Sequence, residues 1–110
     1  MEYIPAADMA AYAGRQVTMI GWLVTEKMTH TKAGDPMEFV TLEDLTTLYE
    51  ATFFPEAYRR FCHLLSGDRP YVLKGLIEEE FGTYSLVVHD LECPLLDREG
   101  ALRERVGGHS

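Results

Sequence analysis

Residues 37–54, MEFVTLEDLTTLYEATFF, decide the fold. Two runs rich in β-branched and aromatic residues, 37–43 and 48–54, flank the turn residues 44–47, a pattern that predicts a β-hairpin. Side chains alternate between the two faces of a strand, so Val40 and Leu42 share one face with Glu38. Val40 and Leu42 are typical of a core, and the opposite face carries Phe39, Thr41 and Glu43.

The segments before the hairpin predict a helix, a strand and a loop. Residues 5–13 are good helix formers, and Gly14 can end that helix at its C-terminus. Residues 17–26 predict a long strand, in which Gly21 permits a bend or a bulge. Residues 29–36, THTKAGDP, predict the loop that leads into the hairpin.

The segment after the hairpin begins as a helix. Pro55 is favoured at the first helical position. An apolar stripe follows at i, i+3, i+4 and i+7, made of Tyr58, Phe61, Cys62 and Leu65. We expect this amphipathic helix to pack its stripe onto the open end of the sheet structure.

Two further strands complete the pattern. Residues 71–79 and 83–91 predict strands on either side of a turn at Phe81-Gly82. The order strand, strand, strand, helix, strand, strand indicates an all-β fold, the five-stranded OB-fold Greek-key barrel with a helix between strands three and four. We expect one OB-fold domain over residues 1–94, including the short N-terminal helix, and a partly helical or disordered tail over 95–110.

Composition limits the cellular setting. The chain has 110 residues, which suits one domain. It holds no run of about 18 apolar residues, so no membrane span is expected. The start, MEYIP, lacks the basic residues and long apolar stretch of a signal peptide. These observations predict a cytoplasmic protein with no membrane partner.

Catalytic and metal-binding motifs are missing from the sequence. Cys62 and Cys93 belong to no C-x-x-C pair, and the histidines are scattered, so neither a metal site nor a cofactor is expected. The sequence contains no Gly-rich phosphate loop, G-x-S-x-G or H-E-x-x-H motif. Asp44 is the residue expected in a hairpin turn. We therefore predict no catalytic residues and no enzyme activity for this chain alone.

Several blocks of sequence resemble one known family. They are VTMIG at 17–21, TKAGDPMEF at 31–39, TLED at 41–44, EATFFPEAY at 50–58 and Lys74-Gly75. Together, residues 17–93 resemble the OB-fold domain near the C-terminus of the bacterial DNA polymerase III α subunit, including its error-prone relatives. The resemblance implies contact with single-stranded template DNA, and the rest of a polymerase or other replication proteins as partners. The carboxylate-rich catalytic core of such polymerases has no counterpart in this chain.

Single-strand binding by an OB-fold needs aromatic faces for stacking and cations that follow the backbone. The candidate residues are Lys27, His30 and Lys32 in the first loop, Phe39 and Thr41 on the second strand, Thr52 on the third, and Lys74 on the fourth. Phe39 either points outward to stack on a base or packs in the core. For Trp22 we expect packing.

The net charge of −8 limits how strongly this chain can bind a polyanion. Glu43 and Glu50 are also expected on the binding face. Single-stranded DNA binding should therefore be weak, and a protein-interaction or structural OB domain with little nucleic-acid affinity is the alternative. A tRNA anticodon binder is a third hypothesis with the same fold. The acidic charge favours the alternative, whereas the blocks at 31–39 and 41–44 favour a polymerase accessory module.

Overall fold

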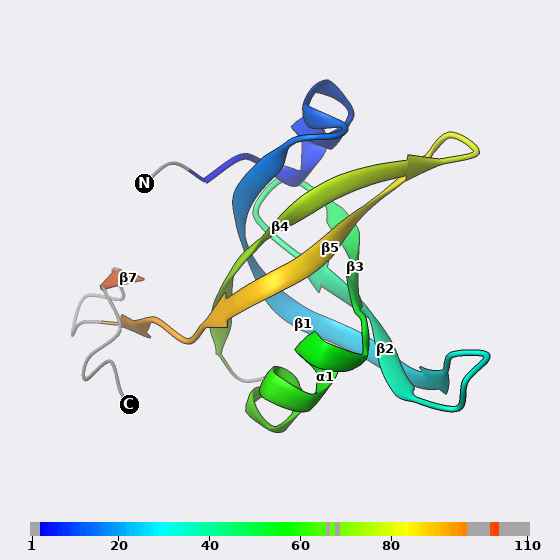
Figure 1. Ribbon diagram of the computed structural model, residues 1–110. Helices are drawn as coiled ribbons and strands as arrows, with labels where there is room; N and C mark the ends of the chain where they lie inside the picture. Colours follow the sequence, from blue (N-terminus) through cyan, green and yellow to red (C-terminus); the bar gives the residue numbers. More distant parts are fainter. Residues whose placement is uncertain (1–2, 66, 68, 97–101, 104–110) are drawn as a thin grey trace.

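The computed structural model describes residues 3–65, 67, 69–96 and 102–103 (Figure 1). Five strands close into a barrel in the order β1-β2-β3-β5-β4, where β3 and β5 pair in parallel and the other neighbours are antiparallel. Their bounds are β1 Gln16–His30, β2 Pro36–Glu43, β3 Leu48–Phe53, β4 Pro70–Glu80 and β5 Thr83–Glu92. The predicted all-β OB-fold barrel is confirmed.

Three short helices accompany the barrel within the residues that the structure describes. The predicted helix between β3 and β4 is confirmed as α1 (Pro55–Phe61), extended by the 3-10 turn η2 (Cys62–Leu64). The predicted N-terminal helix is a 3-10 helix, η1 (Ala6–Tyr12). Gly14 follows it with a φ of 82°, a left-handed conformation that glycine adopts without a steric cost.

The first strand is longer than predicted. Residues 29 and 30 were expected in the loop, yet Glu26 to His30 pair with β2, from Val40 back to Pro36. The loop therefore spans only residues 31–35. Cross-strand hydrogen bonds in an extended hairpin override the turn preference of the local sequence. Lys27 and His30 consequently lie on β1, which corrects the prediction that placed them in a loop.

β1 serves two partner strands by bending at a bulge. Residues Gln16–Trp22 pair with β4, whereas Trp22–His30 pair with β2. The register shifts between Leu23 and Thr25, so Val24 is the extra residue, and the bulge lies three residues after Gly21, where the sequence permits a bend or a bulge.

Gly21 has a different role, because it leaves room for the Tyr49 ring. A Cβ atom at Gly21 would lie 2.6 Å from Tyr49 Oη. That hydroxyl donates a hydrogen bond to the Ile20 carbonyl, with 2.8 Å between the oxygens. The contact fixes the first half of β1 against β3 just before the bulge.

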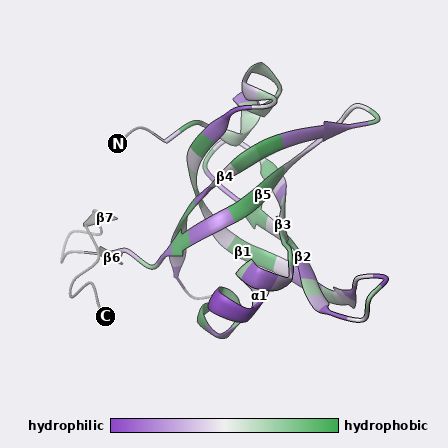
Figure 2. Ribbon diagram, in the orientation of Figure 1, coloured by the Kyte–Doolittle hydropathy of each residue, from purple (hydrophilic) through white to green (hydrophobic). Residues whose placement is uncertain are grey.

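The core lies inside the barrel and is closed at one end by α1 (Figure 1). Fully buried side chains come from all five strands and include Met19, Leu42, Phe53, Tyr71, Leu73, Ile77, Leu86 and Leu91. From the predicted helical stripe, Phe61 is buried, and Tyr58 and Leu65 are partly buried against the core, while Cys62 is half-buried. Figure 2 shows apolar and polar residues interspersed along the strands of the barrel.

Little of the predicted tail is described. β6 (Leu95–Leu96) pairs with β7 (Leu102–Arg103), and the other residues of the expected tail beyond 96 lie outside the described part. A helical or disordered tail therefore stays a prediction. Among the described residues, no helix is long and apolar enough to cross a membrane.

The helix that closes the barrel should contribute strongly to stability. Phe61→Ala is expected to lower the free energy of unfolding by about 3–5 kcal/mol, because it empties a buried site. Phe81→Ala is the matched control, since that ring is exposed, and should change stability by less than about 0.5 kcal/mol. Urea unfolding measures both values. Equal effects of the two substitutions would contradict the packing of α1.

Candidate nucleic-acid interface

A row of cross-strand neighbours crosses the outer face of the barrel. Lys27 on β1 lies opposite Phe39 on β2, which lies opposite Thr52 on β3, which in turn lies opposite Val87 on β5. With neighbouring strands about 4.8 Å apart, this row spans about 14 Å. Three of the predicted site residues are thus neighbours on one face.

Phe39 points away from the core, which decides between the two alternatives that the sequence left open. Its side chain is 43% exposed, whereas Val40 next to it is buried. Lys27 beside it is exposed, so an aromatic face and an ammonium group lie side by side. Thr52 lies on the same row but is buried, and its neighbours leave little of it open to a ligand.

The second row along this face is polar. Thr25, Thr41 and Glu50 are cross-strand neighbours there. The Thr41 hydroxyl donates a hydrogen bond to Glu50 Oε2 at 2.9 Å. Thr41 is therefore on the face as predicted, but its hydroxyl is already paired with an acidic group that repels phosphate.

The third row has two apolar side chains on either side of an acidic one. Trp22, Glu43 and Leu48 are cross-strand neighbours, and all three are exposed. Trp22 is 38% exposed, so the expected packing of this ring is incomplete. Phe39 and Glu43 are four residues apart on β2, which puts the rows of the two aromatic residues about 13 Å apart. The three rows together are called the outer face below.

The remaining predicted residues lie away from the outer face. His30 is exposed at the end of β1 opposite Pro36, and Lys32 is exposed in the loop that follows. This loop is tight, because the Thr31 and Asp35 backbones bond to each other at 2.8 Å. His30 and Lys32 thus lie at the tip of the β1–β2 hairpin, beyond the row of Phe39.

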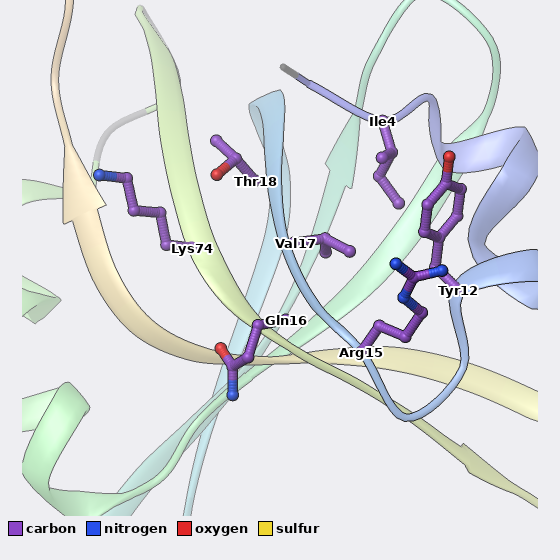
Figure 3. Close-up of a pocket in the computed structure, with 7 residues that line it drawn as sticks. All are labelled: Ile4, Tyr12, Arg15, Gln16, Val17, Thr18 and Lys74. Atoms are coloured by element: carbon purple, nitrogen blue, oxygen red, sulfur yellow. The ribbon is translucent and has the colours of Figure 1, made fainter. Parts of the chain in front are cut away.

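Lys74 does not join the other candidates. It pairs with Thr18 on the first half of β1, and its ammonium lies 3.7 Å from the Glu92 carboxylate. It helps to line a separate shallow pocket with Arg15, which stacks over the Tyr12 ring at 5.5 Å. Figure 3 shows the Lys74 side chain directed away from Arg15, so the two cations do not converge on one anion.

Phe81 is an exposed aromatic residue near the outer face that sequence reasoning missed. Phe81, in the β4–β5 turn, is 96% exposed and has a φ of 54°, which is uncommon for a residue other than glycine. The following residues Gly82, Thr83 and Tyr84 line a groove with Thr41. An aromatic residue in a two-residue turn that usually holds Asn or Gly is the signal that could have revealed it.

An acidic pair lies on the opposite side of the β1–β2 hairpin, near α1. Glu38 points inward and is only 6% exposed, and its Oε1 atom has no hydrogen-bond partner. Burial raises the pKa of Glu38 to about 8, helped by a hydrogen bond and charge repulsion from Glu26. Tyr58 interacts with both carboxyls and with Cys62. At neutral pH, Glu38 is therefore mostly protonated, which lowers the negative charge of the pair.

Asp44 has a structural role in the β2–β3 turn, as expected. It accepts hydrogen bonds from the backbone of Ala6 at 2.7 Å, Thr46 at 2.7 Å and Thr47 at 3.0 Å. Burial pushes the pKa of Asp44 up, but a hydrogen bond from the Thr46 hydroxyl at 2.6 Å, together with these backbone bonds, outweighs burial and holds the pKa below its ordinary value. Among the described residues, no group of three or more His, Cys, Asp or Glu is arranged to hold a metal ion.

A closed five-stranded barrel whose outer face exposes aromatic side chains has the architecture of an OB-fold. The chain belongs to the OB-fold nucleic acid binding domain family, whose model matches residues 17–94. Solved structures share the fold: asparaginyl-tRNA synthetase from Pyrococcus horikoshii superimposes with a TM-score of 0.64 at 17% identity, over 84% of this chain and 22% of the synthetase.

Curated relatives confirm the resemblance to DNA polymerase III α. The DNA polymerase III subunit alpha of Saccharopolyspora erythraea is 37% identical over 75 residues, which is 68% of this chain and 6% of that subunit. The error-prone DNA polymerase of Symbiobacterium thermophilum is 33% identical over 87 residues, which is 77% of this chain and 8% of that polymerase. The chain thus spans less than a tenth of the length of either relative.

The acidic pair predicts an unusual dependence of stability on pH. The pKa of Glu38 is about 8 in the folded state against an ordinary 4.5, so the folded state holds a proton that the unfolded state releases. Wild-type stability should therefore fall as the pH rises between these values. Glu38→Gln removes this fall and, allowing for solvent screening, should stabilise the protein by about 1–3 kcal/mol at pH 8.

Urea unfolding at pH 4 and pH 8 measures this difference. At pH 4 the parent carries a neutral Glu38, so the variant should match it closely. Glu43→Gln is the control, because that side chain is exposed on the outer face. A Glu38→Gln variant as stable as the parent at both pH values would disprove the raised pKa of Glu38.

Proposed function

We propose that this chain binds single-stranded DNA on its outer face, weakly when alone, as a non-catalytic accessory domain of a DNA polymerase III α subunit. The observation that carries the proposal is the exposed Phe39 ring beside the Lys27 ammonium on one row of the barrel. An exposed ring offers a base a stacking surface, and a neighbouring cation offers its phosphate a partner. The similarity to DNA polymerases supports a role in DNA synthesis.

Stacking supplies most of the affinity in this proposal. Each stacked base contributes about 1–3 kcal/mol, whichever base it is. Phe39 and Trp22 offer two stacking surfaces, separated by the polar row that contains Thr41 and Glu50. A short single strand can contact both rings while its backbone passes over the polar row.

Electrostatics supplies little affinity, for a reason visible on the outer face. Lys27 is its one cation within the three rows, and Lys32 extends beyond them, while Glu43 and Glu50 both face a bound strand. The net charge of −8 adds a general repulsion. Such a domain needs to be held near DNA by a tether, which the remaining nine-tenths of a polymerase subunit would provide.

A protein-interaction domain is the second candidate function. The pairing of Thr41 with Glu50 favours it, because the polar row is satisfied internally and is acidic. A partner protein would then cover the exposed Trp22 and Leu48 side chains. The two candidates differ in whether short oligonucleotides reach the outer face at all.

Tryptophan fluorescence distinguishes them directly, because Trp22 is the single tryptophan of the chain. Oligo-dT should quench its emission at micromolar or higher concentration. With Lys27 and Lys32 as the phosphate contacts, log affinity should fall with log salt with a slope of about −1.4. Absence of quenching at low salt would favour the interaction domain.

Substitutions then separate stacking from charge. Phe39→Ala should weaken binding by about 5-fold to 150-fold, the equivalent of one stacked base, and leave the salt slope unchanged. Lys27→Ala should weaken binding modestly and flatten the slope by about 0.7. Lys74→Ala removes the same charge away from the outer face and is the matched control. A Phe39→Ala variant that binds as well as its parent would contradict the proposal.

A further inference from the structure

A pocket of about 400 Å³ lies at the end of the Phe39 row, between α1 and β5. It is lined in part by Phe54, Glu56, Arg60, Val87 and His89. We infer that this pocket is a second nucleotide subsite, where a base stacks on Phe54 and the adjoining phosphate meets Arg60 and His89. The inference rests on the proposed function, since it extends the path of the same strand.

Continuity with the outer face comes from one shared residue. Val87 is the last member of the row that begins at Lys27, and it is also a wall of the pocket. Beyond Val87 the parallel pairing of β3 and β5 ends, and the two strands part. The chain after β3 turns into α1 (Figure 1), and residues of this helix and of β5 line the pocket. A bound DNA strand that leaves the row at Val87 therefore enters the pocket without crossing another helix or β-strand.

The side chains suit a nucleotide. Phe54 directly follows β3 and is exposed, although it is a large apolar side chain. Arg60 lies with its guanidinium carbon 4.6 Å from the centre of the Phe61 ring. In the described part of the chain it has no carboxylate within ion-pair distance, so its donors are open to a phosphate. His89 is exposed on β5 and adds an imidazole to the same wall.

Glu56 opposes the phosphate and gives the inference a sensitive test. It lines the same pocket, so its carboxylate repels a bound anion. Removing that charge should strengthen binding, whereas a residue that merely supports the helix would weaken binding when changed. The pocket is therefore testable by a gain as well as by a loss.

The experiment compares oligo-dT of about four and about ten nucleotides on the 110-residue chain, by fluorescence anisotropy at several salt concentrations. Arg60→Ala should weaken binding of the longer oligonucleotide by about 3-fold to 10-fold and flatten its salt slope by about 0.7, with no effect on the shorter one. Arg59→Ala, its neighbour on α1 with the same charge but outside the pocket lining, is the matched control. Glu56→Gln should tighten binding of the longer oligonucleotide by about 2-fold.

The outcomes separate the subsite from the proposed function. If Arg59→Ala and Arg60→Ala weaken binding of the two lengths equally while Phe39→Ala still weakens binding, the subsite is overturned and the outer face stands. If the parent binds neither length, both are overturned. Circular dichroism checks that each variant is folded, and His89→Ala against His63→Ala repeats the test on β5 should a helix variant unfold.

Discussion

The bulge at Val24 is the constraint on which the rest of the structure depends. β1 has 15 residues and must pair with β4 along its first half and with β2 along its second half to close the barrel. The extra residue bends the strand between these halves. It also changes which residues face outward: even-numbered ones such as Trp22 before it, and odd-numbered ones such as Lys27 after it.

The side-chain chemistry of both faces follows from this shift. Because successive residues alternate, a slip of one position exchanges every side chain between the faces. With the bulge, Lys27 lies beside Phe39 on the outer face, and Glu26 lies with Glu38 on the inner side near α1. Without it, the carboxylate would replace the ammonium next to the exposed ring. The bulge therefore places Lys27 on the face where the candidate ligand binds, and places Glu26 and Glu38 on the other side of the hairpin.

The sequence predicts the fold and the face of β2 on which Phe39 lies, because both depend on short-range patterns. Strand alternation determines the face of β2 on which Phe39 lies, and the order of strands and helix determines the barrel topology. Lys74 lies away from the other candidates, because its position depends on the register of β4 against the first half of β1, which no local pattern encodes. The burial of Thr52 and the exposure of Trp22 likewise depend on neighbours from other strands. Phe81 was missed because turn propensity alone gives no reason for an aromatic side chain there.

The most direct test of the account is a titration of the ¹⁵N-labelled chain with oligo-dT, followed by NMR. The account predicts that backbone amides shift after the bulge, at Thr25 and Lys27, and on β2 at Phe39 and Thr41. Amides of β4 around Lys74 should stay unchanged, because that strand pairs with the other half of β1. Shifts confined to β4 and its neighbours, with the residues after the bulge silent, would contradict the claim that the bulge builds the binding face.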